Sequence, residues 1–594
     1  MIKCDSNFQF YLAGKRVDDY YHIRASLTYD LILEKIFLKR EGFEWFWPIS
    51  VPGPLYPTYY LKESYKRLSF AKRWPLDRKK SYMKKVSRWL KKNRYLKEYC
   101  DSPLSLVETG SRPLSNQGLL DKLRFLIKGK NIFINEIQDG LAEMGLEVSL
   151  DEIKKCMVPL LVKDEIELLP ANLPEPNVCL RCESRKLDQT YCGLCRQETW
   201  TCPDCLSMGE SLTCRPLFRD NKIKIKKSLQ KVSPLYNFSL SPYQKELSQG
   251  LKSALDQKDK YWLLWAVCGA GKTEVTFAMI GEALSRGGRV LFTSPRREVV
   301  RQMEKRLDQA FPGVEQVGLY GGSQYKYLQG QLFVSTVHQL VRFYQTFDLI
   351  IFDEVDAYPY QGNKRLERLL ERSLAPNGQV VYLSATPSDK LLYRVKKGDV
   401  NLLTLPARYH QHPVPLPQLL KSKLPTQPDW NKMPYQIREM IDFSLAQEYQ
   451  LFIFLPTRKM VERFGRSFQL SYINNSQTPL IEYTHSKDEE RSTKVNNFLD
   501  GEYPILVTTT IMERGVTVPK SNVLVLYADQ EHIFNHQSLI QMAGRAGRSY
   551  QAPDGKVWFL ARRKSKEMGK ARRLIFKINK EAKRRNLITE EGIR

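Results

Sequence analysis

The sequence has few acidic residues for its basic content, only seven histidines and no long apolar run. None of its 594 residues lies in a run of about 18 apolar residues, the length that a membrane-spanning helix needs. The opening residues, MIKCDSNFQFYLAGKR, hold no apolar stretch long enough for a secretory signal. We therefore expect a cytoplasmic protein without a transmembrane segment.

The shortage of acidic residues leaves a strong positive charge. The chain carries 93 Lys and Arg against 65 Asp and Glu, for a net charge of +28. Such an excess favours a polyanionic partner, either nucleic acid or an anionic membrane face. Hydrophobic residues make up 42% of the chain, which is enough for several globular cores.

Two segments concentrate this charge. Residues 62–97 hold 15 basic residues and two acidic ones, and residues 562–585 hold 12 and two. Each segment fits a contact with nucleic acid or acidic lipid, and each equally fits a solvated basic helix. We assign residues 1–123 to a basic, aromatic N-terminal extension and the second segment to a C-terminal helix.

Short apolar runs alternate with helical stretches from about residue 236 onward. This alternation is typical of βαβ units and predicts an α/β fold with parallel sheets. A proline-rich stretch interrupts it, and prolines keep such a segment extended. The predicted domains are a small helical element at 124–173, a cysteine module at 174–216, a first lobe at 230–404, a linker at 405–430 and a second lobe at 431–594.

A phosphate-binding loop is predicted in YWLLWAVCGAGKTEVTFAMI, residues 261–280. Gly269 and Gly271 allow a tight turn whose N–H groups point at phosphate oxygens, and Lys272 reaches the β- and γ-phosphates. Thr273 is expected to hold Mg²⁺, and the following helix adds its positive N-terminal end. Ala266 replaces the usual first glycine, a mild departure because that position needs only a small residue.

The acidic partner of this loop is FDLIIFDEVDAYPY, which begins at residue 347. A carboxylate at the end of a buried strand can hold Mg²⁺, and the next carboxylate can polarise the attacking water. We assign these roles to Asp353 and Glu354. Together with the loop, they predict a site that binds and hydrolyses a nucleoside triphosphate.

Nine motifs in order, over about 350 residues, resemble the helicases and translocases of superfamily 2. They are SPYQKEL (241–247), AVCGAGKT (266–273), TSPRREVVRQ (293–302), STVHQL (335–340), DEVD (353–356), LSATP (383–387), FLPTRKMVE (454–462), TTTIMERGVTVP (508–519) and QMAGRAGR (541–548). The form A-x-x-G-x-G-K-T, which this superfamily prefers, accounts for Ala266. The resemblance implies two RecA-like lobes preceded by a small zinc module and a basic N-terminal extension.

The same resemblance implies functional residues. Arg545 and Arg548 would be arginine fingers supplied by the second lobe, and Gln244 would sense the base. The expected ATP and Mg²⁺ contacts are Gln244, Gly269, Ala270, Gly271, Lys272, Thr273, Asp353 and Gly515. The expected DNA contacts, through phosphates rather than base edges, are Thr293, Pro295, Arg296, Thr336, His338, Thr457, Arg458, Thr508 and Thr509.

Residues 124–590 resemble more closely the ComFA family of late-competence ATPases. The resemblance rests on WAVCGAGKTE, DEVDAYPY, TTTIMERGVTVP and a cysteine module that precedes the motor. It implies an ATP-dependent translocase or helicase that drives uptake of single-stranded DNA, with partners among the competence proteins. It also implies a place at the inner face of the cell membrane.

Six of the eleven cysteines form three CxxC pairs within 27 residues, a spacing typical of zinc sites. The family pattern favours one Zn²⁺ on Cys179, Cys182, Cys202 and Cys205, the last followed by Leu-Ser-Met-Gly. The pair Cys192 and Cys195 is the alternative, either in place of an outer pair or with Cys214 on a second ion. A metal would fold a module too small to fold alone.

Three other functions stay open from the sequence. A replication-restart helicase shares the zinc cysteines, but there they lie within the motor, whereas here they precede it. An RNA helicase fits the DExD motif less well. A zinc-dependent DNA-binding adaptor with an idle motor conflicts with the intact Lys272, Glu354, Arg545 and Arg548.

Overall fold

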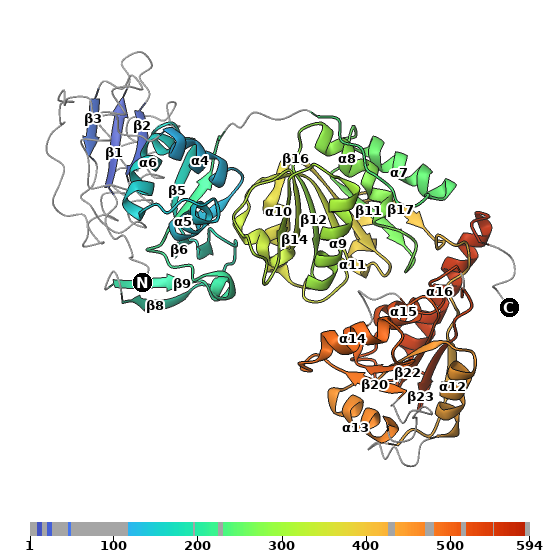
Figure 1. The fold of residues 1–594 in the computed structure, drawn as a ribbon. Coiled ribbons are helices and arrows are strands. Elements are labelled where there is room, and N and C mark those ends of the chain that lie inside the picture. Colours follow the sequence, from blue (N-terminus) through green and yellow to red (C-terminus); the bar gives the residue numbers. More distant parts are fainter. Residues whose placement is uncertain are drawn as a thin grey trace. The chain divides into compact units, whose positions relative to one another are not determined.

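The structure is a computed structural model (Figure 1). It describes residues 9–14, 21–26, 45–48, 117–193, 197–223, 230–425, 434–469, 480–512, 518–550 and 552–588. The basic segment at 62–97, Cys195 and Gly515 lie outside these residues, so the predictions for them stay predictions. By its internal contacts the chain divides into two compact units, one of residues 1–232, 283–350 and 358–378, the other of residues 233–282, 351–357 and 379–594.

The first unit begins with two small antiparallel sheets. One has the strand order β2-β1-β3 and the other β4-β10-β5. Their strands are β1 (Gln9–Gly14), β2 (Tyr21–Ser26), β3 (Trp45–Pro48), β4 (Asn131–Phe133), β5 (Ile166–Pro170) and β10 (Pro216–Asp220). Helices α4 (Gln117–Ile127), α5 (Ile134–Glu143) and α6 (Leu150–Val162) form a hydrophobic core with the second sheet.

The cysteine module follows as two short hairpins. They comprise β6 (Asn172–Leu173), β7 (Val178–Cys179), β8 (Asp188–Cys192) and β9 (Gln197–Thr201), followed by the 3-10 helix η2 (Pro203–Met208). Strand β6 pairs with β7, and β8 pairs with β9. Among the described residues of the module at 174–216, the buried hydrophobic ones are all cysteines, which fits a fold held by a metal.

A seven-stranded sheet of order β13-β14-β12-β15-β16-β11-β17 forms the first lobe. Its strands are β11 (Tyr261–Ala266), β12 (Val290–Ser294), β13 (Gln316–Leu319), β14 (Leu332–Thr336), β15 (Phe347–Asp353), β16 (Leu374–Ser384) and β17 (Asn401–Leu405). The pairings of β11 with β16 and β17, and of β14 with β12 and β13, are parallel. Strands β12 and β14 are buried at every position, as parallel strands covered on both faces require.

Helices connect these strands, and several begin at a side-chain cap. They are α7 (Pro242–Ala254), η3 (Glu274–Thr276), α8 (Phe277–Ser285), α9 (Arg297–Ala310), η4 (Val337–Arg342), α10 (Lys364–Ser373) and α11 (Asp389–Lys396). Ser241 and Gln244 form a capping box at α7, and Asn363 and Ser388 cap α10 and α11.

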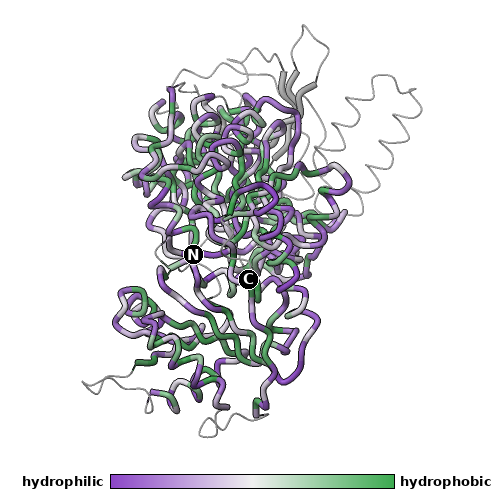
Figure 2. Tube along the Cα trace, turned by 90° about the vertical axis from the view of Figure 1, so that its right-hand side faces the viewer, coloured by the Kyte–Doolittle hydropathy of each residue, from purple (hydrophilic) through white to green (hydrophobic). Residues whose placement is uncertain are grey.

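The second lobe is a six-stranded sheet of order β18-β23-β22-β19-β21-β20, in which all five pairings are parallel. Its strands are β18 (Gln418–Lys421), β19 (Gln450–Phe454), β20 (Ile481–Thr484), β21 (Ile505–Thr508), β22 (Ser521–Leu526) and β23 (Val557–Ala561). Its helices are α12 (Tyr435–Ala446), α13 (Arg458–Gln469), α14 (Arg491–Leu499), η6 (Thr510–Met512), α15 (His536–Ala543) and α16 (Lys566–Arg584). Figure 2 shows the strands of the C-terminal sheet as hydrophobic segments, with hydrophilic segments outside them.

The two parallel sheets confirm the predicted α/β class with two motor lobes. The predicted domain limits stay predictions. The stretch predicted as an extended linker at 405–430 also supplies β18 to the second sheet, which the sequence analysis did not anticipate. In the part of the chain that the structure describes, no helix combines the length and apolarity needed to cross a bilayer.

Candidate active site

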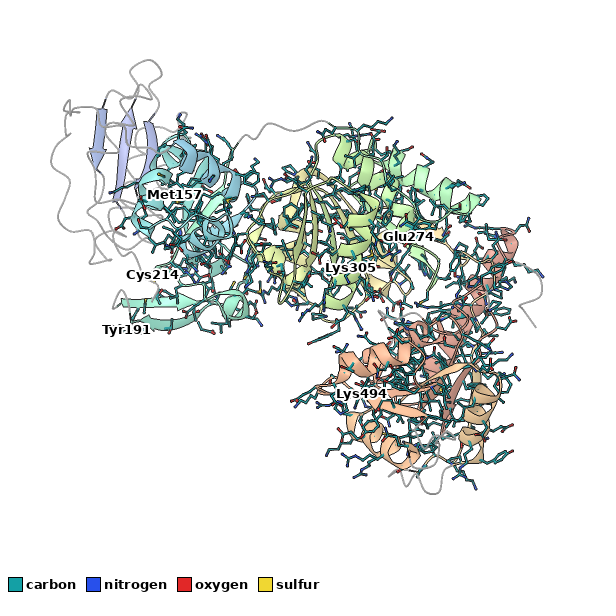
Figure 3. The ribbon with its side chains drawn as sticks, in the orientation of Figure 1. Met157, Tyr191, Cys214, Glu274, Lys305 and Lys494 are labelled. Atoms are coloured by element: carbon teal, nitrogen blue, oxygen red, sulfur yellow. The ribbon has the colours of Figure 1, made fainter. Side chains whose placement is uncertain are left out.

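The phosphate loop joins β11 to η3, as its motif requires. Gly269 and Gly271 have φ values of 80° and 72°, a left-handed backbone that favours glycine. Gln244 lies against this loop, since its Nε2 donates to the carbonyl oxygen of Ala270 at 2.9 Å. A Cβ on Gly271 would lie 2.7 Å from that Nε2. Glu274, labelled in Figure 3, begins the helical turn after the loop.

Lys272 pairs with the first carboxylate of the DExD motif. Its Nζ lies 2.5 Å from Asp353 Oδ1, and the Asp353 side chain is buried. Burial opposes the charge on the lysine, but Asp353, Glu354 and Asp356 outweigh it and raise the pKa of Lys272. The ammonium therefore stays charged and ready for a phosphate, and Thr273 is buried beside it in the loop.

Glu354 occupies a strained position at the end of β15. Its φ is 56°, a left-handed conformation that a residue with a side chain rarely adopts. Its backbone N–H donates to Asp353 Oδ1 at 2.8 Å, and the residue is only 9% exposed. A strained backbone conformation persists only where the surrounding structure holds it in place, and such positions are often found at active sites.

The second aspartate of DEVD anchors the LSATP segment. Asp356 accepts hydrogen bonds from the hydroxyls of Ser384 and Thr386, each at 2.7 Å. Thr386 in turn contacts α15: its carbonyl accepts from Gln537 Nε2 at 2.8 Å, and its hydroxyl accepts from Gln541 Nε2 at 3.3 Å. A hydrogen-bonded chain thus runs from the DExD motif to the helix that precedes the two predicted arginine fingers.

Both predicted fingers lie in the loop after α15. Arg545 is buried, and Arg548 is half-buried with its Nε donating to the Gly544 carbonyl at 2.8 Å. Burial lowers the pKa of Arg548, while Glu354 and the thiol of Cys268 act in the opposite direction. The structure therefore brings Arg548 within electrostatic range of the carboxylate expected to polarise water.

The sequence analysis missed Arg408, which lies just beyond β17. Its guanidinium is buried and donates to four carbonyl oxygens. The acceptors are Cys268 at 3.1 Å from Nε, Ala546 at 2.8 Å and Gly547 from Nη1, and Gly544 at 3.2 Å from Nη2. One side chain thus joins the phosphate loop to the arginine-finger loop. No motif marks it, because backbone carbonyls carry no sequence signature.

The predicted DNA-contacting residues follow the carboxyl ends of strands, where ligands of parallel sheets bind. In the first lobe, Thr293 lies near the end of β12, and Pro295 and Arg296 follow it. Thr336 ends the neighbouring strand β14, and His338 follows it. The Thr293 hydroxyl bonds the Ser335 carbonyl at 2.8 Å. Arg296 and His338 are half-buried, and burial together with Arg365 lowers the pKa of His338.

The second lobe repeats this arrangement. Thr457 and Arg458 follow β19 and are exposed. Thr508 ends the adjacent β21, and Thr509 follows it. Thr508 is fully buried, so only its main chain can face a bound strand without rearrangement. Each lobe thus groups its own candidates at one edge of its sheet.

Four cysteines form a compact sulfur cluster in the cysteine module. The Sγ atoms of Cys179, Cys182, Cys202 and Cys205 all lie within 4.8 Å of one another, and all four residues are buried. The distances are 3.8 Å from Cys179 to Cys205 and 3.6 Å from Cys182 to Cys202. Tetrahedral Zn²⁺ with bonds of about 2.3 Å places its sulfurs about 3.8 Å apart, so the donor set fits this ion.

Two other described cysteines of the module, Cys192 and Cys214, do not belong to this cluster. Cys192 is buried at the end of β8, and Cys214 is half-buried (Figure 3). Tyr191, beside Cys192, is exposed on the β8–β9 hairpin. The structure therefore brings the four cysteines of the outer pairs together, whereas Cys195 of the alternative pair lies outside the described residues.

Comparisons with known proteins agree with these motifs. Residues 237–389 match the family model described as the res subunit of type III restriction enzymes, and residues 432–550 match the helicase conserved C-terminal domain. Both domains imply ATP and Mg²⁺.

Three relatives are similar over much of the chain. Competence protein ComFA of Bacillus subtilis (strain 168) is 36% identical over 383 residues, which are 64% of this chain and 80% of that protein. Competence protein ComFA of Streptococcus pneumoniae is 35% identical over 419 residues, 70% of this chain and 94% of that protein. The transcription-repair-coupling factor of Staphylococcus haemolyticus is 25% identical over 350 residues, 55% of this chain and 27% of that protein. The chain belongs to the ComFA family and is an ATP-dependent helicase or translocase of superfamily 2.

Proposed function

We propose that this motor binds single-stranded DNA and drives its uptake during natural competence. One observation carries the proposal: the chain matches 94% of a competence protein, and the matched region includes an assembled nucleotide site. Single-stranded DNA is the expected substrate because phosphate contacts at the strand ends of both lobes hold a strand without reading its sequence.

Each residue of the site has its own role in ATP hydrolysis. Lys272 exchanges Asp353 for the β- and γ-phosphates when ATP enters, since its ammonium lies at the end of the phosphate loop. Thr273 and Asp353 would hold Mg²⁺, which neutralises charge on the phosphates. Glu354 orients the attacking water, and Arg545 and Arg548 stabilise the charge of the transition state, a contribution of about 10³–10⁵ in rate for such arginines.

The chain from Asp356 to Gln541 is the proposed route by which the nucleotide state reaches α15. Asp356 is three residues from Asp353, so a shift there changes the bonds to Ser384 and Thr386. Thr386 then displaces or releases Gln537 and Gln541. Alternation between two such arrangements is what a motor needs to move along a strand.

Zn²⁺ is proposed to be bound by Cys179, Cys182, Cys202 and Cys205 and to hold the module in its fold. The further parts of the proposal are a cytoplasmic location at the inner face of the membrane and contacts with other uptake proteins. The net charge of +28 supports attraction to both DNA and anionic lipid.

Two alternatives make different predictions. An adaptor with an idle motor would show no hydrolysis with any nucleic acid, whereas the pairing of Lys272 with Asp353 at the phosphate loop supports an active motor. An RNA-remodelling enzyme would respond to RNA at least as strongly as to DNA.

The test is steady-state ATP hydrolysis by the full chain with single-stranded DNA, duplex DNA or RNA, with Lys272→Ala as control. Stimulation by single-stranded DNA above that by duplex DNA or RNA supports the proposal. Equal or greater stimulation by RNA contradicts it, and the absence of hydrolysis with every nucleic acid favours the adaptor.

A further inference from the structure

A buried arginine lies inside the first cysteine pair. Arg181 occupies the third position of Cys-Leu-Arg-Cys and is 0% exposed, although arginine is rarely fully buried unless it is paired. Its guanidinium packs over the Phe133 ring, with Cζ 4.2 Å from the centroid. Its Nη1 donates to the carbonyl oxygen of Gly209, just beyond the second pair, at 3.0 Å. Arg181 therefore joins the two halves of the metal site from outside the sulfur cluster.

The same guanidinium points toward the first lobe. Arg181 Nη2 donates to Glu136 Oε1 at 2.8 Å, and Arg342 Nε donates to that same oxygen at 3.3 Å. Glu136 and Arg342 are both nearly fully buried. A single carboxylate oxygen thus bridges an arginine of the metal module and an arginine of the first lobe. All three belong to the first compact unit.

Arg342 is the last residue of η4, the segment that starts right after Thr336 and contains His338. It also donates to Gln339 within that helix. The bridge therefore ends at the last residue of the segment that follows Thr336 and contains His338, two of the predicted DNA contacts.

A second link runs in parallel through the main chain. Arg372, near the end of α10, donates to the Arg181 carbonyl and, at 2.8 Å, to the Val341 carbonyl of η4. Its side chain is buried as well. Both the side chain and the backbone of Arg181 are thus tied to the last turn of η4.

We propose that Arg181 and Glu136 are positioning residues through which the loaded metal site orients η4 for its contact with DNA phosphates. A metal fixes the backbone of the knuckle, and hence the place of Arg181. Arg181 and Arg372 then fix η4, because charges buried together tolerate little displacement. When the metal leaves, the knuckle relaxes, and η4 loses both anchors. The DNA part of this inference rests on the proposed function, whereas the mechanical link does not.

The first experiment is hydrogen exchange of the full-length wild-type protein, loaded with zinc and after its removal by a chelator. We expect faster exchange of amides in 337–342 on zinc removal and unchanged exchange in α9, which lies in the same lobe but outside the Arg181–Glu136–Arg342 bridge. Unchanged exchange in 337–342 overturns the proposal. An equal rise in α9 also overturns it, because the whole lobe would then be responding.

The second experiment compares two matched substitutions. Glu136→Gln removes the carboxylate charge that pairs with Arg181 and Arg342, whereas Glu165→Gln removes a charge that pairs with Arg124 within the helical element. We expect Glu136→Gln to keep its zinc and its ATP hydrolysis without DNA, but to raise the half-saturating concentration of single-stranded DNA by about fivefold or more. Glu165→Gln should leave that concentration unchanged.

A double-substitution cycle separates positioning from general damage. Arg342→Gln should weaken DNA saturation as Glu136→Gln does, and the double variant should be no worse than either single one. Additive effects, or equal effects of Glu136→Gln and Glu165→Gln, contradict the proposal. If single-stranded DNA does not stimulate the wild type, the proposed function fails, while the hydrogen-exchange result still decides the mechanical link.

Discussion

Arg408 Nε lies 3.1 Å from the carbonyl oxygen of Cys268, so a residue just beyond β17 is bonded to the phosphate loop. The other nitrogens of the same guanidinium bond carbonyls of the loop that carries Arg545 and Arg548. The phosphate loop and the loop of the two predicted arginine fingers are thus held to one another by a third side chain. Burial and the charge of Arg548 lower the pKa of Arg408 to about 9.

Arg408→Gln should separate catalysis from ATP binding. The substitution leaves carbonyls without donors, which costs about 1–3 kcal/mol of stability, and it displaces the fingers. A misplacement of about 1 Å can cost about a hundredfold in rate, so kcat should fall by about ten- to a hundredfold with a smaller change in KM for ATP. The control is Arg585→Gln, which alters an arginine bonded to Tyr243 and Glu581 instead. An unchanged kcat in Arg408→Gln would remove its positioning role.

Substitution of Gly544 tests how closely the phosphate loop and the loop after α15 must approach each other. A Cβ at Gly544 would lie 2.4 Å from the Cβ of Cys268, whereas one at Gly569 in α16 would meet nothing within 4 Å. Gly544→Ala should therefore lower both ATP hydrolysis and thermal stability, the latter by about 1–3 kcal/mol for overpacking. Gly569→Ala should retain full hydrolysis. Adding Cys268→Gly to Gly544→Ala removes the clash and should restore part of the activity; failure to recover would place the defect elsewhere.

Much of this architecture could be predicted from the sequence. Strands such as β12, β15 and β22 are short apolar runs between polar stretches, so parallel sheets leave a visible pattern. The nucleotide residues are grouped in motifs because phosphates need donors at fixed spacing. Strand β18 was not anticipated, since its four residues lie within a proline-rich segment.

Two kinds of contact could not be predicted from the sequence. One is a side chain that bonds to backbone carbonyls, and the other is a pair of side chains that lie far apart along the chain. Arg181 and Glu136 are 45 positions apart, and Glu136 and Arg342 are 206 apart. Each looks like an ordinary charged surface residue until the fold buries it. Arg408 is similar, since its acceptors are carbonyls that any residue provides.

Lys130 predicts a pH dependence of stability. It is buried, with its Nζ donating to the Tyr327 carbonyl, and burial followed by Arg289 lowers its pKa to about 7, against opposing effects of Glu143 and Glu136. The folded state therefore binds fewer protons than the unfolded state between pH 7 and the lysine's ordinary value of 10.5, so stability rises with pH in that window.

The measurement is chemical denaturation of the wild type and Lys130→Met at pH 7 and pH 9. From pH 7 to 9 the wild type should gain about 2 kcal/mol in free energy of unfolding relative to Lys130→Met. If the wild type and Lys130→Met differ in free energy of unfolding by the same amount at pH 7 and pH 9, Lys130 keeps its ordinary pKa in the folded state.

The cysteine cluster predicts one zinc per chain. Cys202→Ser should abolish zinc binding and lower the melting temperature, because metal binding contributes to the folding of such modules. Cys192→Ser should retain one zinc, since Cys192 does not belong to the cluster. Elemental analysis of the purified proteins gives the number of zinc ions per chain. Two zinc ions in the wild type, or loss of zinc in Cys192→Ser, would indicate that Cys192 and Cys195 bind metal.

We propose that ATP hydrolysis moves this protein along single-stranded DNA. The most direct measurement is displacement of streptavidin from the end of a biotinylated single strand by the full chain. We predict displacement that requires ATP, is lost in Lys272→Ala and is slowed in Arg408→Gln. ATP hydrolysis stimulated by DNA but without any displacement from either end would contradict the account.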